Sequence, residues 1–184
     1  MIHNFLRQLL YRLRGDVATS TLISRGMKVG KNFERMAGVI LDDSHCWLIE
    51  IGDNVTMAPR VHVLCHDAST KKFLGYTKIG RVTIGNNVFI GAESVILPGI
   101  KIGNNVVIGA NSTVTHDIPD GTVVAGSPAK KLCSLDEYLE KEKTRMTTSP
   151  CYDESYTMRS SELELNKKLQ QQRELSNGII GFVE

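Results

Sequence analysis

The sequence predicts an all-β solenoid, a chain wound into stacked coils of short strands. Three observations support this prediction: aliphatic residues return at every sixth position, small residues often follow them, and a block of eighteen residues occurs twice. A period of six fits neither an amphipathic helix, which repeats about every 3.6 residues, nor a plain alternating strand. It fits a short strand followed by a corner, repeated around a coil.

The six-residue repeat continues without a gap through the middle of the chain. Its first positions are Ile84, Ile90, Ile96, Ile102, Ile108 and Val114. Its fifth positions are Val88, Ser94, Ile100, Val106, Ser112 and Ile118. We expect both sets to point inward, while glycines and pairs of asparagines form the corners, where a side chain on an unusual backbone conformation is costly.

A longer period predicts the shape of each coil. The blocks "IGNNVFIGAESVILPGIK" and "IGNNVVIGANSTVTHDIP" align eighteen residues apart, so three units of six form one turn. Three edges close a triangular coil, and successive coils stack about 4.8 Å apart through backbone hydrogen bonds. Earlier blocks beginning at Val29 and Ile51 follow the same rule in another register.

The chain is predicted to divide into three parts. Residues 1–15 carry apolar side chains at helical spacing and predict a short N-terminal capping helix. Such a helix is either a plug over the open end of the coils, which we expect, or a basic helix on a membrane surface. Residues 16–132 form the coil domain, and residues 133–184 predict a helical C-terminal extension because capping-box spacings occur twice there.

Composition argues against several classes of function. The net charge is only +2 and no basic run has interleaved aromatic residues, so no nucleic-acid partner is expected. No apolar stretch approaches the roughly 20 residues that span a membrane, so no membrane span is expected. Because we expect the N-terminal helix to be a plug, we expect no membrane association. The four cysteines have no spacing suited to zinc and are expected to be free thiols. These features predict a soluble cytoplasmic protein.

The repeat loses its register at the stretch "VLCHDASTKKFLGYTK", which begins at Val63. The interval from Val63 to Ile84 is 21 residues, three more than a whole coil. The extra residues predict a loop extruded from the coil over residues 67–78, with His66 at its base. Loops on a repeat scaffold are where binding residues collect, so we interpret His66 as a functional residue.

The segment "VTIGNNVFIGAESVILPGIKIGNNVVIGANSTVTHDIPDGTVVAGSPAKKL" resembles the acetyl-CoA-dependent O-acetyltransferases of the maltose, galactoside and nodulation-factor group. It also resembles acetyltransferases of polysaccharide biosynthesis, and the similarity extends over residues 29–132. The resemblance implies a left-handed parallel β-helix of hexapeptide repeats, with acetyl-CoA as the acetyl donor. It also implies a homotrimer with sites between subunits. The hand of the coil follows from the resemblance alone.

In that family a histidine at the base of the extruded loop is the general base, and His66 matches it. Imidazole, with an ordinary pKa of about 6.5, can take the proton of a hydroxyl group at neutral pH. The expected reaction is direct attack of a sugar or polysaccharide-precursor hydroxyl on the thioester, with the oxyanion held by N–H or side-chain donors. Asp67 is a candidate to orient the imidazole.

The resemblance also implies a set of binding residues. Ala92 and Ala110, eighteen residues apart, would let the pantetheine arm of acetyl-CoA lie against backbone groups. Thr115 and His116 match the positions near the nucleotide end of the acetyl-CoA groove, where the family has threonine and lysine. Lys130 matches a basic residue that reaches the CoA phosphates.

For the acceptor, Asp42 and Asp43 resemble an acidic position that hydrogen-bonds the sugar in sugar-acetylating members. An asparagine that those members carry a few residues upstream is absent, because Arg35 or Met36 stands there. The acceptor pocket is therefore expected to differ from theirs.

Several alternatives remain open. Serine or an antibiotic of the chloramphenicol type could accept the acetyl group with the same base and donor groove. A zinc site like that of the γ-carbonic anhydrases would need a third histidine beside His62 and His66 at whole-coil spacing, so no metal is expected. Nucleophilic catalysis by Cys65 is disfavoured because neighbouring side chains on a strand face opposite sides. An inactive scaffold would not explain His66 and its loop.

Overall fold

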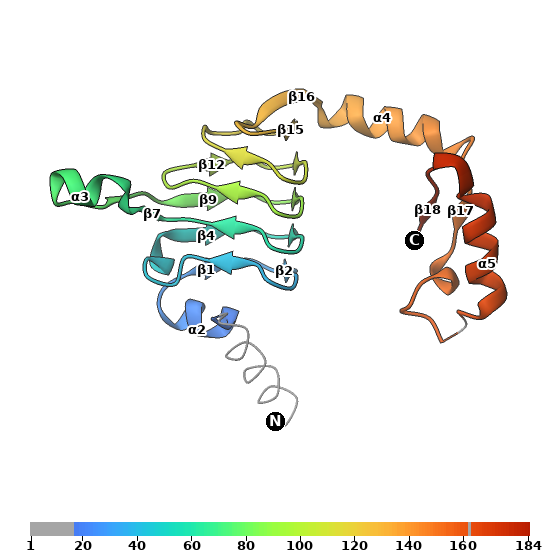
Figure 1. The fold of residues 1–184 in the computed structure, drawn as a ribbon, viewed down its shortest axis with the longest axis horizontal. Helices are drawn as coiled ribbons and strands as arrows, with labels where there is room; N and C mark the ends of the chain where they lie inside the picture. Colours follow the sequence, from blue (N-terminus) through green and yellow to red (C-terminus); the bar gives the residue numbers. More distant parts are fainter. Residues whose placement is uncertain (1–16, 162) are drawn as a thin grey trace. The chain divides into compact units, whose positions relative to one another are not determined.

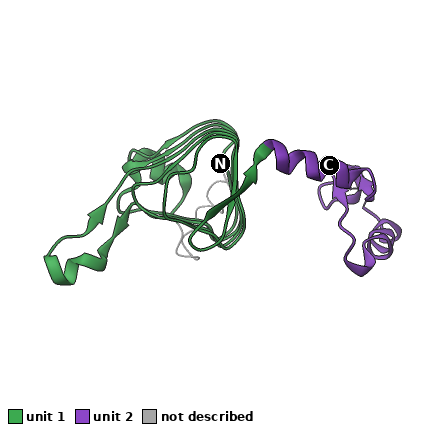
Figure 2. Ribbon diagram, turned by 90° about the horizontal axis from the view of Figure 1, so that it is seen from above, with its two compact units in different colours: residues 1–135 green, residues 136–184 purple. Residues whose placement is uncertain are grey.

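The computed structural model describes residues 17–161 and 163–184. The predicted N-terminal helix over residues 1–15 lies outside the described residues. The described residues up to Leu135 and those from Asp136 onward form two compact units (Figure 2).

The first unit is built from three parallel sheets (Figure 1). The first sheet contains β1 (Lys28–Val29), β4 (Ile49–Ile51), β9 (Val82–Ile84) and β12 (Lys101–Ile102). The second contains β2 (Glu34–Arg35), β5 (Val55–Met57), β10 (Val88–Ile90), β13 (Val106–Ile108), β15 (Thr122–Ala125) and β16 (Lys130–Ser134). The third contains β3 (Ile40–Leu41), β6 (His62–Val63), β11 (Val95–Ile96) and β14 (Thr113–Val114). Apart from β7 (His66–Asp67) and β8 (Lys78–Ile79), which pair with each other, the strands up to β14 visit the three sheets in rotation, so the chain winds in stacked coils, and the predicted parallel sheets are confirmed.

The pairing register reproduces the eighteen-residue repeat. Val88 pairs with Val106, and Ile90 pairs with Ile108, each eighteen residues later. The antiparallel pairing of β16 with β15 ends the second sheet. Equivalent positions of the repeat therefore lie directly above one another.

The inward positions form the apolar core of the first unit. Each first-position isoleucine from Ile84 to Ile108 has at most 1% of its surface exposed. Two fifth positions are buried serines: the hydroxyl groups of Ser94 and Ser112 both donate to the carbonyl oxygen of Gly109, at 3.0 and 2.6 Å. These bonds satisfy the polar groups that burial would otherwise destabilise.

Asparagines form a ladder along the corner between the first and second sheets. Asn54, Asn87 and Asn105 have φ values of 55°, 56° and 56°, the left-handed region that asparagine tolerates better than most residues. The Asn54 amide donates to Asn87, and the Asn87 amide donates to Asn105, both at 2.9 Å. The corner asparagines thus both adopt the turn and connect the coils.

The extruded loop is larger than the sequence interval suggests. β7 (His66–Asp67) pairs antiparallel with β8 (Lys78–Ile79), and the 3₁₀ turn η2 (Ala68–Thr70) and helix α3 (Lys71–Leu74) close the loop. Figure 1 shows α3 projecting from the side of the coils. Val63 pairs with Ile96, 33 residues later, which is 15 more than the 18 of a regular coil. The count of three extra residues was wrong, because it assumed that a complete coil separates Val63 from Ile84. In the structure, all fifteen additional residues lie in one corner of a single coil.

A second insertion was not expected. Ile40 pairs with His62, 22 residues later, which is four more than a regular coil. The additional residues lie after β3, in the corner that contains the 3₁₀ turn η1 (Cys46–Leu48). Both insertions therefore occur in the corner that leads from the third sheet to the first.

Helix α2 (Thr19–Ser24) precedes the coils, and its Leu22 joins the core of the first unit. The elements from residue 135 onward are α4 (Leu135–Met146), β17 (Cys151–Tyr152), η3 (Glu154–Tyr156), α5 (Leu165–Glu174), η4 (Ser176–Gly178) and β18 (Phe182–Val183). All four cysteines are free thiols, as expected. Within the described residues, no helix combines the length and apolar character needed to cross a membrane.

Truncating a core isoleucine should destabilise the coils in proportion to the volume removed. Ile96 has no exposed surface, so Ile96→Val should lower the free energy of unfolding by about 0.5–1.5 kcal/mol and Ile96→Ala by about 2–5 kcal/mol. Urea unfolding followed by circular dichroism measures both values. Equal stability of the two variants and the wild type would show that this position is not in a packed core.

Candidate functional site

The candidate site lies in the corner where both insertions occur. Leu41 of β3 pairs with Val63 of β6, and the backbone N–H of Asp42 donates to the Val63 carbonyl at 2.9 Å. The residues that follow β3 on one coil are thereby placed against those that follow β6 on the next. This stacking brings Asp42 beside Cys65 and His66, although they are more than twenty residues apart in the chain.

The Asp42 carboxylate is buried, with 1% of its side chain exposed. One oxygen, Oδ1, accepts from the Ser44 hydroxyl at 2.8 Å and from the backbone N–H groups of Ser44 and His45 at 3.2 and 3.1 Å. The other oxygen, Oδ2, accepts from the Cys65 N–H at 2.8 Å and lies 2.5 Å from Nδ1 of His66.

These donors keep the carboxylate ionised. Burial alone would raise the pKa of Asp42, but hydrogen bonds from Ser44, Cys65, His66 and His45 hold that pKa below its ordinary value. A buried ionised carboxylate stays stable only when its oxygens are satisfied in this way.

The Asp42 contact determines the tautomer of His66. An ionised carboxylate can only accept, so Nδ1 of His66 carries the proton and donates it to Asp42. Nε2 of the neutral ring then has a free lone pair. The His66 side chain is 40% exposed, so a molecule from solvent can reach the ring.

Asp67 does not orient His66, and that candidate was wrong. Its carboxylate pairs with the Lys78 ammonium at 2.6 Å and accepts from the Ser69 N–H at 2.8 Å. Both partners belong to the extruded loop, so Asp67 stabilises the loop instead. The orienting carboxylate is Asp42, which stands 24 residues before the histidine.

The expectation that Asp42 hydrogen-bonds a sugar is also corrected. Both of its oxygens are buried and engaged within the chain, so an acceptor cannot reach them. Asp43, by contrast, is exposed. The sequence alone cannot show which of two adjacent aspartates points inward.

Two further residues complete the site, and sequence reasoning missed both. The Ser44 hydroxyl lies 3.0 Å from Nδ1 of His45 and 3.3 Å from Nδ1 of His66. The His45 ring lies between those of His66 and Trp47, with centroid distances of 5.4 and 5.3 Å. The four additional residues in this coil were the available signal, but they are visible only once the strands are paired.

The residues expected to bind acetyl-CoA near its pantetheine arm and its nucleotide lie in two different corners of the coils. Ala92 and Ala110 follow β10 and β13 in the corner between the second and third sheets, and the Asn111 N–H donates to the Ala92 carbonyl at 2.7 Å. Thr115 and His116 follow β14 in the same type of corner as His66, and their side chains contact each other at 2.8 Å.

Lys130 is exposed on β16. Within one chain, the structure therefore brings His66 near Asp42 but places Ala92 and Ala110 across the third sheet from it.

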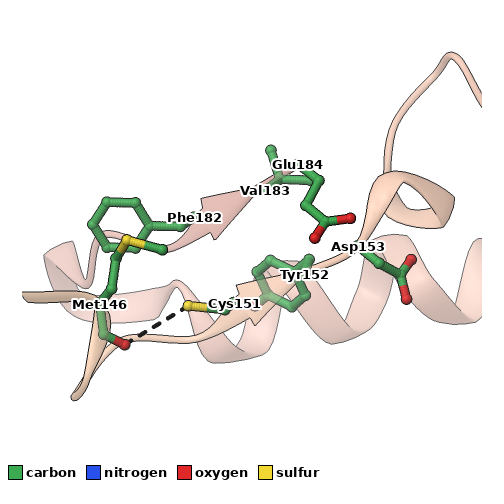
Figure 3. Close-up of a pocket in the computed structure, with 7 residues that line it drawn as sticks. All are labelled: Met146, Cys151, Tyr152, Asp153, Phe182, Val183 and Glu184. Atoms are coloured by element: carbon green, nitrogen blue, oxygen red, sulfur yellow. Dashed lines mark hydrogen bonds between the residues drawn. The ribbon is translucent and has the colours of Figure 1, made fainter. Parts of the chain in front are cut away.

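A separate pocket of about 460 Å³ lies within the second unit (Figure 3). It is lined by Met146, Cys151, Tyr152, Asp153, Phe182, Val183 and Glu184. The Cys151 thiol donates to the Met146 carbonyl at 3.7 Å. No histidine or lysine lines this pocket, so it lacks a base comparable with His66.

Comparison with known proteins places the chain in a family. The model of the bacterial transferase hexapeptide (six repeats) matches residues 81–116. Protein CapG of Staphylococcus aureus is 40% identical over 134 residues, which cover 71% of this chain and 76% of CapG. The chain belongs to the hexapeptide-repeat transferase family.

Two solved structures of this enzyme family are similar to the chain. A maltose O-acetyltransferase from Clostridium difficile 630 is 40% identical with a TM-score of 0.51, and the match covers 59% of each chain. A hexapeptide-repeat acetyltransferase from Vibrio cholerae O1 biovar eltor, solved in complex with acetyl-coenzyme A, is 29% identical with a TM-score of 0.53. That match covers 60% of this chain and 61% of the other, so the chain spans less than two thirds of either structure.

Removing the charge of Asp42 should change stability in a pH-dependent way. Because the pKa of Asp42 is lower in the folded protein than in the unfolded chain, ionisation stabilises the fold above the ordinary carboxyl pKa. That stabilisation is lost as the pH falls through the folded value. At neutral pH, Asp42→Asn should lower the free energy of unfolding by about 1–3 kcal/mol.

The difference between wild type and Asp42→Asn should shrink as the pH falls below about 4. Urea unfolding of both proteins between pH 7 and pH 3 measures this difference. The other carboxyl groups are the same in both proteins, so their effect on stability cancels in the comparison. A difference that stays constant or grows between pH 4 and pH 3 would contradict the assignment of a stabilising, ionised Asp42.

Proposed function

We propose that the protein is an acetyl-CoA-dependent O-acetyltransferase in which His66 is the general base toward a hydroxyl of a sugar or polysaccharide precursor. The observation that carries the proposal is the contact of 2.5 Å between the buried Asp42 carboxylate and Nδ1 of His66. This contact leaves Nε2 as the proton acceptor on a half-exposed ring. Membership of the hexapeptide-repeat transferases supports the type of reaction.

The proposed reaction is a direct transfer. Nε2 of His66 takes the proton of the acceptor hydroxyl while that oxygen attacks the thioester carbonyl carbon. The carbonyl becomes an oxyanion, then re-forms as the carbon–sulfur bond breaks. The CoA thiolate leaves and takes the proton from the imidazolium ring. Asp42 holds the ring in place and stabilises its positive charge during the transfer, as the carboxylate does in a catalytic triad.

The donor site is proposed on the corner that carries Ala92 and Ala110. Small residues on successive coils leave room for a pantetheine arm against the backbone, and Thr115, His116 and Lys130 would lie toward the nucleotide. The Vibrio cholerae relative in complex with acetyl-coenzyme A supports this donor. Use of acetyl-CoA would place the reaction in the cytoplasm.

We further infer a homotrimer of left-handed coils with shared sites. His66 and the two alanines lie on different corners of one chain, so a neighbouring subunit would bring its Ala92 and Ala110 corner to His66. Closed cyclic symmetry then yields three equivalent sites. The hand of the coil is inferred from family membership.

The acceptor is proposed to be a sugar because the chain is similar to a maltose O-acetyltransferase. Asp43 is exposed one residue after Asp42, so it remains the carboxylate that can hydrogen-bond the acceptor. Serine and chloramphenicol-type acceptors stay as alternatives because the same base would serve them.

Replacing the base should abolish most of the activity. His66→Ala should reduce the rate of acetyl transfer by at least about a hundredfold, the lower range for a general base. The measurement is acetyl-CoA turnover against a panel of sugars, oligosaccharide fragments, serine and chloramphenicol, with circular dichroism to verify folding. A folded His66→Ala variant that kept most of its activity would exclude this mechanism.

The adjacent thiol provides a matched control. Burial, together with the nearby Asp42 charge, raises the pKa of Cys65 to about 12, so the side chain is a neutral thiol at pH 7 and a poor nucleophile. Cys65→Ala should therefore retain most of its turnover. Loss of activity equal to that of His66→Ala would favour an acetyl-cysteine intermediate instead.

Mixing two inactive variants tests the shared site. His66→Ala and Ala110→Trp subunits should each be inactive, while trimers reassembled from both should regain activity where an intact His66 meets an intact Ala110. Light scattering should give a mass about three times that of the 20.4 kDa chain. A monomeric enzyme, or mixed trimers without activity, would contradict a site between subunits.

A further inference from the structure

We propose that Asp42, His45 and His66 form a binding site for a divalent transition-metal ion such as Zn²⁺, and that the bound ion blocks acetyl transfer. The inhibition rests on the proposed function, whereas the metal site itself does not. All three residues lie in the corner that leads from the third sheet to the first, where both insertions occur. Asp42 and His45 are on one coil, and His66 is on the next.

The donor set suits zinc. One ligand atom from each of the three residues lies within 4.8 Å of the others. Two imidazole nitrogens and one carboxylate oxygen match zinc sites that keep a fourth position open. The nitrogen donors also argue against Mg²⁺ and Ca²⁺, which prefer oxygen ligands.

The distances between the ligand atoms are close to those that an ion requires. Tetrahedral zinc with bonds of about 2.0–2.2 Å separates its ligand atoms by about 3.3–3.6 Å. In the structure, Nδ1 of His66 lies 2.5 Å from one oxygen of Asp42, Oδ2, and Nδ1 of His45 lies 4.0 Å from the other oxygen, Oδ1. To share one ion, the His66 and Asp42 side chains must move apart, and His45 must move closer to the carboxylate.

A hydroxyl group occupies the centre of the cluster. Ser44 Oγ lies 2.8 Å from Asp42 Oδ1, 3.0 Å from His45 Nδ1 and 3.3 Å from His66 Nδ1. All three ligand atoms therefore already converge on one polar position. Rotation of the Ser44 side chain would open that position to an ion, and the histidine side chains are 28% and 40% exposed, so the ion has a route from solvent.

Metal binding and base catalysis exclude each other at this site. To bind the ion, Nδ1 of His66 must lose the proton that it donates to Asp42, and that proton goes to solvent. The positive ion then withdraws electron density from the ring and makes Nε2 a weaker base. It also takes up the Asp42 charge that would stabilise the imidazolium.

Isothermal titration with Zn²⁺ tests the site independently of activity. The parent protein carries Cys133→Ser and Cys151→Ser, because these two thiols are not buried and could bind zinc themselves. We expect one ion per chain in this parent. His45→Phe, which retains an aromatic ring between His66 and Trp47, should weaken binding at least tenfold, and His45→Gln provides a second variant should the first not fold.

Ser44→Ala provides the matched control. It removes the central hydroxyl but no ligand, so it should bind zinc at least as tightly as the parent. Unchanged zinc binding in both His45 variants would overturn the site, as would an absence of binding to the parent at micromolar zinc.

Inhibition is measured as acetylated acceptor, because zinc also binds the CoA thiol. Zinc should inhibit the parent reversibly, with recovery on adding EDTA, and Mg²⁺ should not inhibit. For His45→Phe, relative to its own metal-free rate, the half-inhibitory zinc concentration should rise at least tenfold. An equal half-inhibitory concentration would overturn the proposal. Zinc binding through His45 in a chain without acetyl transfer would contradict the proposed function and leave the metal site standing.

Discussion

Parallel pairing between successive coils sets the positions of the contacts in the candidate site. It places Leu41 beside Val63, and so positions the carboxylate of Asp42 against the Cys65 N–H and the His66 ring. Neither contact could arise from local structure, because the partners lie on different coils. Hydrogen bonds of the buried serines and of the asparagine ladder hold successive coils in the same register. The positions of the side chains in the site follow from that register.

The buried charge of Asp42 links stability with chemistry. Taking a carboxylate out of water is costly, and this cost is offset by donors on both oxygens. One of those donors is the imidazole that we assign as the base, so the same contact stabilises the fold and orients the ring. The arrangement that attracts a proton between Asp42 and His66 also attracts a metal ion, since both are positively charged and bind the same lone pairs.

A coil of this kind separates its corners by the width of a sheet, which constrains where a two-substrate site can form. The base lies in one corner and the small residues assigned to the donor lie in another. A second chain can join two different corners without any change in the coil itself. The inserted loop, held by the Asp67–Lys78 ion pair, projects from the corner that carries the base.

The parallel coils, their eighteen-residue period and the position of His66 at a break in the repeat were predictable from the sequence alone. These features are local or periodic, so they can be read along the chain. Strand pairing in the folded chain was needed to show that fifteen residues are inserted in one corner, that Asp42 and not Asp67 contacts His66, and that Ser44 and His45 join them. These contacts could not be predicted because they form between stacked coils, where closeness depends on strand register and not on separation along the chain.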